Sequence, residues 1–206
     1  MRHSLMAIVA LAMAGSAPIQ AQTTPAPAPA PEKKDAAGSI LDKAVNKPGT
    51  DWVVYGANQT IKAMTDDAVP GGQVIRATVT AKGTNAWDVG ASSPIQKPIM
   101  AGDTILLAVY LRGPELKEGE TMPLPFVGIN GAAPPYENLT GTDVRITRAW
   151  KLYYASGKAM KNYPGNAMRA TIHLAGDKHV VDLGPVFVLD FGQNYTKKLP
   201  DNNTPQ

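Results

Sequence analysis

Residues 71–113 constrain the fold of this chain more than any other part of it. Apolar and polar side chains alternate over residues 75–81, which is the period of a strand with one apolar face. Residues 104–111 are almost continuously apolar, which fits a strand buried on both faces. Glycines enclose that run with only ten residues between them, and a helix is usually longer. The segment therefore predicts two long strands joined by a loop that carries Trp87.

The rest of the chain alternates short apolar runs with turn-forming residues. Its 19 glycines and 18 prolines fit a turn-rich β protein, and no helical period longer than about three turns appears. Further strands are expected at residues 52–55, 59–64, 124–129, 143–147, 149–154, 167–174 and 180–191. A short helix capped by Ser39 is expected at residues 39–46. The sequence thus predicts an all-β fold, a two-sheet antiparallel β-sandwich.

The N-terminal residues have the pattern of a secretory signal peptide. In residues 1–21, a short polar segment precedes an apolar run of about ten residues, which is too short to span a bilayer. A membrane anchor is the alternative. A Pro/Ala-rich linker with a short lead-in follows over residues 22–50, the sandwich over residues 51–192, and a polar tail, expected to fray, over residues 193–206. We therefore expect a secreted or periplasmic protein with no membrane insertion after processing.

Composition and motifs narrow the possible functions. Cysteine is absent, so disulfides and thiolate metal sites are excluded. The formal net charge is +3 and no basic run exceeds two residues, so no nucleic-acid partner is expected. No nucleophile elbow, zinc-protease motif or phosphate loop occurs. A protein that is not an enzyme is therefore expected. The alternative is a glycan-acting hydrolase, although the clustered Glu115, Glu118 and Glu120 have the pattern of a solvated loop.

Aromatic residues on expected loops indicate sugar binding. Sugars have apolar C–H faces and polar edges, so a ring flanked by amide, carboxylate or guanidinium groups suits them. A ring that buries about 50 Å² of a sugar contributes on the order of 1 kcal/mol. The candidate ligand-binding residues are Arg76, Asn85, Trp87, Tyr110, Arg112, Tyr136, Glu137 and His173, with Gln73 as a further polar companion.

Each candidate also has a purely structural interpretation. Trp87 is alternatively a core anchor at the mouth of the sandwich, and Tyr136 alternatively packs only its own loop. Arg76 and Arg112 alternatively pair with carboxylates. Asp190, near the last expected strand, is a candidate ligand for a structural calcium, the one cofactor considered, and its alternative is a hydrogen bond at the strand end.

Taken together, these motifs resemble the jelly-roll carbohydrate-binding modules found attached to xylanases and other glycosidases. The first matches are Gly71-Gly72 with Arg76, then Gly83, Asn85, Trp87 and Asp88, then Gly102-Asp103 with Arg112-Gly113. The later matches are Trp150 with Tyr153, Tyr163 to Ala167, and Val181 to Gly192. The resemblance covers residues 50–192. Residues 176–179 depart from it, because the family has a Gly-x-x-x-Gln segment there, so a ligand contact from that loop is not carried over.

The resemblance implies a galactose-binding-like jelly roll in an exported, non-catalytic protein that binds a polysaccharide or an oligosaccharide. A glycosidase or a cell-envelope component is the macromolecular partner considered. The alternative is a structural or protein-interaction sandwich without sugar binding, since this fold hosts many ligands. Exposure distinguishes the two. Trp87 and Tyr136 on one open surface favour sugar binding, whereas two inward-packed rings favour the scaffold.

Overall fold

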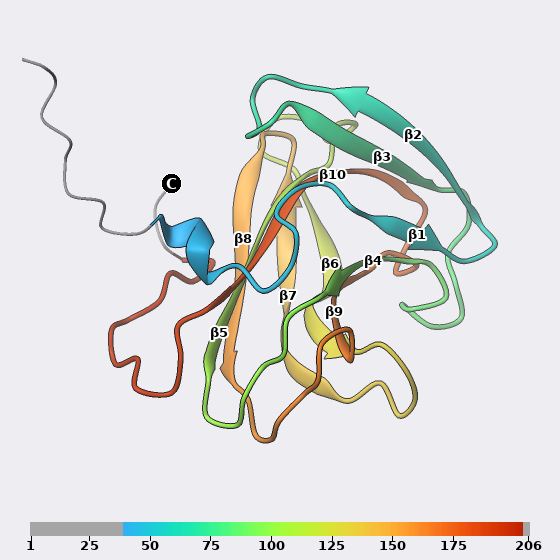
Figure 1. The fold of residues 1–206 in the computed structure, drawn as a ribbon. Coiled ribbons are helices and arrows are strands. Elements are labelled where there is room, and N and C mark those ends of the chain that lie inside the picture. The colour runs from blue at the N-terminus through green and yellow to red at the C-terminus, as the bar shows by residue number, and fades with distance from the viewer. Residues whose placement is uncertain (1–38, 204–206) are drawn as a thin grey trace, which may run out of the picture. The chain divides into compact units, whose positions relative to one another are not determined.

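The structure, a computed structural model, describes residues 39–203 (Figure 1). The signal peptide and the Pro/Ala-rich part of the linker, expected at residues 1–38, lie outside the described residues, as do residues 204–206. Between residues 39 and 203, no helix has the length and apolarity needed to cross a membrane.

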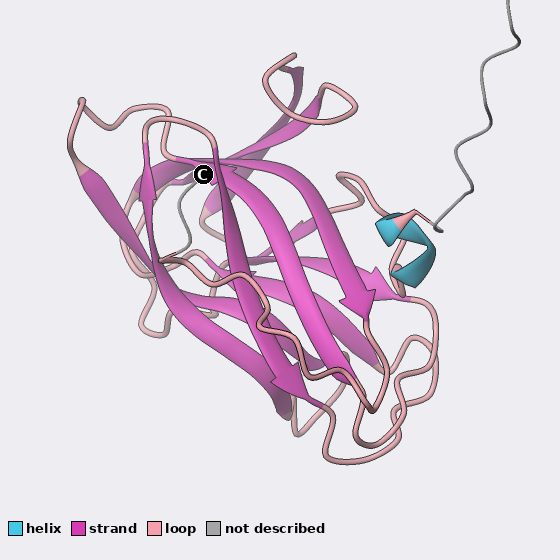
Figure 2. Ribbon diagram, turned by 90° about the vertical axis from the view of Figure 1, so that its left-hand side faces the viewer, coloured by secondary structure: helices cyan, strands magenta, loops and turns pink. Residues whose placement is uncertain are grey.

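Ten strands form two five-stranded antiparallel sheets in the described part of the chain. The first sheet contains, in spatial order, β1 (Val53–Tyr55), β4 (Gly90–Ile95), β9 (Met168–His173), β6 (Thr121–Gly131) and β7 (Asn138–Thr147). The second contains β2 (Gln59–Thr65), β3 (Gln73–Val79), β10 (His179–Asp190), β5 (Thr104–Arg112) and β8 (Lys151–Lys158). Strands make up nearly all of the regular structure in Figure 2. The predicted all-β sandwich is therefore confirmed.

Apolar side chains of both sheets meet in one core. β5 is buried along almost its whole length, as its continuously apolar sequence predicts. In β9, the buried Met168, Ala170 and Ile172 alternate with Arg169 and His173. Because successive side chains of a strand point to opposite faces, this alternation turns Arg169 and His173 to the outer face of the first sheet. That face carries the residues of the candidate site.

The folded part begins before residue 51, the start expected from the sequence. A 3-10 helix, η1 (Ile40–Lys43), is capped by Ser39, so the expected short helix is present but ends at Lys43, before residue 46. The chain then follows β10. The buried Asn46 side chain accepts the Val188 N–H at 2.7 Å and donates to the Val186 carbonyl at 3.1 Å. These bonds satisfy polar groups that would otherwise be buried without partners, so this lead-in segment is part of the sandwich.

Strand β4 lies in the segment that was expected to be loop after Trp87. Its sequence, GASSPI, contains a proline and small residues instead of a β-branched run, so it lacks the usual composition of a strand. Pairing with β9 nevertheless buries its Ala91 and Ile95 side chains in the core. β4 is therefore a strand because it pairs with β9, and not because its own residues favour a strand.

The C-terminal tail is ordered against the edge of the second sheet as far as it is described. The Asn202 side chain accepts the Tyr154 N–H at 2.8 Å and donates to the Tyr154 carbonyl at 3.1 Å. These are the bonds that a neighbouring strand would make with β8. The tail that was expected to fray thus bonds to the backbone of β8 at Asn202.

Candidate functional site

A cavity of about 650 Å³ opens on the outer face of the first sheet. β1, β6, β9 and the first residue of β7 supply its floor, and the loops before β4 and before β7 supply its walls. Its lining residues are Tyr55, Trp87, Asn130, Pro135, Tyr136, Asn138, Arg169 and His173. Three of these, Trp87, Tyr136 and His173, are predicted site residues. The structure thus brings together side chains that lie up to 86 positions apart in the sequence.

A short polar loop presents the Trp87 ring. The Asp88 carboxylate accepts the Asn85 N–H at 2.9 Å and the Asn85 side-chain amide at 3.3 Å, which closes the loop on itself. The Asn85 N–H is the main cause that lowers the pKa of Asp88, so the carboxylate is charged at neutral pH. The Ala86 carbonyl accepts the Ala175 N–H at 2.9 Å, which ties the loop to the end of β9. Trp87 is 58% exposed, so it is not the core anchor that was its alternative.

Tyr136 faces the cavity from a second loop, between β6 and β7. Its backbone has a φ of 55°, in the left-handed region, and it follows the cis peptide bond between Pro134 and Pro135. The Tyr136 N–H donates to the Ala133 carbonyl at 2.9 Å, which closes the turn. The side chain is 49% exposed. Tyr136 therefore does more than pack its own loop.

Strand register places aromatic and imidazole rings in one row on the floor. Gly90 of β4 and Phe126 of β6 both pair with His173. The His173 ring stacks on Phe126 with centroids 4.7 Å apart and meets Trp87 edge-on at 6.0 Å. Gly90 makes room for this row, because a Cβ there would lie 2.4 Å from the Tyr55 hydroxyl oxygen. The floor is thus an apolar platform with polar rims.

Arg169 lies four positions before His173 on the same face of β9 and carries the positive charge of the cavity. Its guanidinium carbon is 5.7 Å from the centre of the Tyr55 ring and 5.6 Å from that of Tyr136. Its Nε donates to the Asn130 side-chain oxygen at 3.4 Å. Both rings attract the cation and hold it between β1 and the loop before β7.

Burial of two histidines predicts a pH-dependent stability. Burial, with a smaller effect from Arg169, lowers the pKa of His173, and burial lowers that of His179. As pH falls below about 6.5, the unfolded chain takes up protons before the folded chain does, so the free energy of unfolding should decrease. Urea unfolding at pH 7.5 and at pH 5.5 measures this loss.

The matched variant for that measurement is the double substitution His173→Phe with His179→Leu. Its unfolding free energy should fall less between pH 7.5 and pH 5.5 than that of the wild type. Asp190 has a pKa raised mainly by burial, so its protonation stabilises the fold as the pH falls, which opposes the effect of the histidines. Both the wild type and the double variant contain Asp190, so comparing their losses of unfolding free energy cancels its contribution. An equal loss in both chains would contradict the assignment to the histidines.

Two predicted site residues on the loops bond within the protein. Asn85 bonds to Asp88, as described above. The Glu137 carboxylate accepts from the Lys161 ammonium group and, at 3.4 Å, from the Tyr163 hydroxyl, and the Lys161 bond lowers the pKa of Glu137. Both side chains therefore help to hold the walls of the cavity.

The other predicted site residues lie on the second sheet. Arg76 of β3 donates two hydrogen bonds to the buried Asp182 carboxylate at 2.7 and 2.9 Å, and Arg112 of β5 donates a third at 2.8 Å. Arg112 also pairs with Asp66 at 2.9 Å. The structural alternative, in which the two arginines pair with carboxylates, is thus what the structure shows. Tyr110 lies on β5 of this same sheet.

Asp190, the candidate calcium ligand, accepts the Gly192 N–H at 2.7 Å. This is the strand-end hydrogen bond that was its alternative. In the described part of the chain, no three His, Cys, Asp or Glu side chains are grouped closely enough to hold a metal ion.

Sequence reasoning missed five lining residues: Tyr55, Asn130, Pro135, Asn138 and Arg169. A usable pattern exists for one of them. Arg169 lies four positions before His173 on a strand, so the same alternation that selected His173 also selects Arg169. No sequence pattern indicates that β1 and β6 flank this face.

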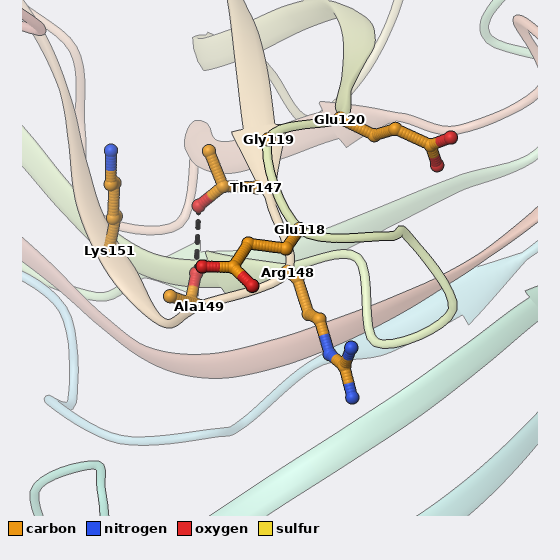
Figure 3. Close-up of a pocket in the computed structure, with 7 residues that line it drawn as sticks. All are labelled: Glu118, Gly119, Glu120, Thr147, Arg148, Ala149 and Lys151. Atoms are coloured by element: carbon orange, nitrogen blue, oxygen red, sulfur yellow. Dashed lines mark hydrogen bonds between the residues drawn. The ribbon is translucent and has the colours of Figure 1, made fainter.

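A second hollow of about 550 Å³ lies at the β7–β8 turn (Figure 3). Its lining residues are Glu118, Gly119, Glu120, Thr147, Arg148, Ala149 and Lys151. The charged ends of Glu120, Arg148 and Lys151 point away from one another in Figure 3. This arrangement is that of a solvated surface, and it contains two of the glutamates considered for a hydrolase.

Comparisons with known proteins agree on the fold. No family model matches the chain, and no curated protein matches its sequence. A solved chain described as "CBM4 structure and function" aligns with a TM-score of 0.51 and 16% identity, over 74% of this chain and 99% of that chain. Part of the arabinose-bound MgGH51 α-L-arabinofuranosidase aligns with a TM-score of 0.51 and 15% identity, over 72% of this chain and 26% of that chain. The N-terminal cellulose-binding domain of β-1,4-glucanase C from Cellulomonas fimi aligns with a TM-score of 0.48 and 16% identity, over 77% of this chain and all of that chain (100%).

The first two alignments define the fold class. This chain has the β-sandwich fold of carbohydrate-binding modules such as CBM4, and the fold also occurs as part of a longer glycosidase chain. The predicted resemblance is thereby confirmed at the level of the fold.

Proposed function

We propose that this protein binds a carbohydrate in the cavity of the first sheet and does not transform it. One observation carries the proposal: Trp87 and Tyr136, 58% and 49% exposed, line the same cavity. Aromatic side chains usually lie largely in the interior, so two exposed rings in one hollow indicate a binding surface. This is the arrangement that separates sugar binding from a structural sandwich.

The chemistry of the lining supports a sugar as ligand. The rings of Trp87 and Tyr136 suit the C–H faces of a pyranose, and the amides of Asn130 and Asn138 suit its hydroxyl groups. A volume of about 650 Å³ is within the range of small-ligand sites. The shared fold with CBM4 supports the same conclusion.

The surroundings of His173 support binding without catalysis. A hydrolase that uses this histidine needs a carboxylate beside it. The ring neighbours of His173 are instead Phe126 and Trp87. Glu137, an acidic neighbour of the cavity in sequence, bonds to Lys161. These contacts fit a platform for a ligand better than a proton-transfer site.

Export belongs to the proposal as well. The pattern of residues 1–21 supports a signal peptide and a secreted or periplasmic location. A polysaccharide outside the cell is a fitting ligand for such a protein, and a glycosidase or cell-envelope component is a fitting partner. Fractionation of the producing cells tests the location, since retention in the cytoplasm would contradict it.

A glycan-array screen of the full chain, with and without calcium, tests the proposed function. We expect binding to a coherent set of polysaccharides. A change in binding on calcium removal would show that a calcium ion supports binding, with Asp190 as the candidate ligand to test. Silence across the array, from a protein shown to be folded by circular dichroism, would contradict the proposal and favour the protein-interaction module.

A further inference from the structure

We propose that the sugar bound in this cavity carries a carboxylate, as uronic acids do, and that Arg169 binds this carboxylate. The inference rests on the proposed carbohydrate function and names the class of sugar. It follows from the hydrogen-bonding groups that the cavity offers to a ligand.

Arg169 is a cation without an anionic partner among the described residues. It forms no ion pair with any carboxylate of residues 39–203, and its one hydrogen bond, from Nε to Asn130, leaves both terminal guanidinium nitrogens without an acceptor there. Arg76 and Arg112 differ sharply, because both form ion pairs with Asp182 and Arg112 forms a second one with Asp66. The positive charge of Arg169 is therefore available to a ligand.

Two tyrosine rings hold that charge at the cavity. Tyr55 and Tyr136 lie on opposite parts of the chain, one on β1 and one on the loop before β7, and both are within 6 Å of the guanidinium carbon. A ring restrains the cation but does not neutralise it as a carboxylate does. A planar guanidinium held in this way is suited to bind the two oxygens of a carboxylate with two parallel hydrogen bonds.

Asn130 adds a second donor beside Arg169. Its side-chain oxygen accepts the Thr171 hydroxyl at 2.6 Å and the Arg169 Nε at 3.4 Å. The Arg169 Nε–H can only donate, so the oxygen of the amide must face it and the NH₂ group is left as a donor in the cavity lining. Among residues 39–203 this NH₂ group has no acceptor, and it is not one of the fully buried unpaired atoms, so a ligand or water can reach it.

The nearby acid is turned to other partners. Glu137 follows Tyr136 directly, yet its carboxylate bonds to Lys161 and Tyr163. Arg169 and Asn130 therefore form a pair of donors whose natural complement is a ligand rich in acceptors. Among common sugars, the uronic acids supply two carboxylate oxygens on one ring.

The test compares each acidic oligosaccharide with its carboxyl-reduced form, in which a hydroxymethyl group replaces the carboxylate. Calorimetric titration of the full chain would use oligogalacturonate, oligoglucuronate and oligomannuronate, each beside its reduced form. We expect one acidic oligosaccharide to bind about tenfold more tightly than its reduced form, as a charge-assisted bond implies. Higher salt should weaken that preference.

Variants assign the preference to Arg169. Arg169→Gln should remove the tenfold preference, and Arg169→Lys, which keeps a charge without the planar fork, should retain part of it. Arg148→Gln removes an equal charge in the separate hollow of Figure 3 and should leave the preference unchanged. A preference that survives Arg169→Gln would overturn the role of Arg169. If Arg169→Gln does not fold, the comparison of acidic and carboxyl-reduced oligosaccharides on the wild-type chain still tests the carboxylate inference.

The outcomes separate this inference from the proposed function. If reduced or neutral oligosaccharides bind as tightly as the acidic ones, the carboxylate inference is wrong and carbohydrate binding stands. If neither form of any oligosaccharide binds and the glycan array is silent, both proposals are wrong.

Discussion

Trp87→Ala should weaken glycan binding about thirtyfold and leave the fold intact. A tryptophan platform that removes roughly 80 Å² of apolar surface from water contributes about 2 kcal/mol, at roughly 25 cal/mol per Å². The ring is 58% exposed and its loop is closed by Asp88 and Ala175, so the substitution removes little packing. Calorimetric titration and urea unfolding measure the two effects separately.

Ile61→Ala is the matched control for this prediction. Ile61 is 60% exposed, close to the value for Trp87, but lies on β2 of the second sheet. Its removal should change neither affinity nor unfolding by a measurable amount. Two results would contradict the account: loss of folding in Trp87→Ala, or glycan affinity unchanged by it.

Asp182→Asn should lower the free energy of unfolding by about 3 kcal/mol. The fully buried carboxylate binds both Arg76 and Arg112, so the substitution removes the ion pair of Arg76 and leaves Arg112 paired with Asp66 alone. Removing one partner of a buried ion pair costs about 3–5 kcal/mol, and the two arginines keep some exposure to water, so the lower end applies. Urea denaturation measures the change.

Lys47→Ala serves as its control, because the Lys47–Asp51 pair is exposed and should leave the unfolding midpoint unchanged. An Asp182→Asn chain as stable as the wild type would contradict the assigned role.

Arg76→Gln and Arg112→Gln test a different point, the location of the sugar site. Loss of glycan binding in a folded Arg76→Gln or Arg112→Gln chain would move the site to the second sheet.

Local sequence patterns predicted much of the sandwich. The continuous apolar run of β5 matches a strand that is buried on both faces, and the alternation in β3 matches a strand that is buried mainly on one face. β4 was missed because its strand character comes from pairing with β9, 73 to 83 positions later, and its own residues are mostly small. The same reason explains Asn46, whose bonds to β10 span 140 and 142 positions.

The candidate site was predicted only in part, because a sequence does not state which sheet a side chain reaches. Arg76 and Arg169 both alternate with buried residues on a strand, so their local patterns are alike. Arg76 meets Asp182 across the register of β3 and β10, whereas Arg169 meets Pro94 and Asn130. Only this long-range register separates the neutralised arginine from the unpaired one.

The indole N–H resonances of the three tryptophans test the central claim most directly. Trp52 and Trp150 donate theirs to the Gly184 carbonyl at 2.8 Å and to Asp66 at 3.0 Å, both outside the cavity, whereas Trp87 lies in it. Titration of isotope-labelled protein with the best glycan of the array should shift the Trp87 resonance and leave the other two in place. Movement of Trp52 or Trp150 with a static Trp87 would contradict a sugar site on the first sheet.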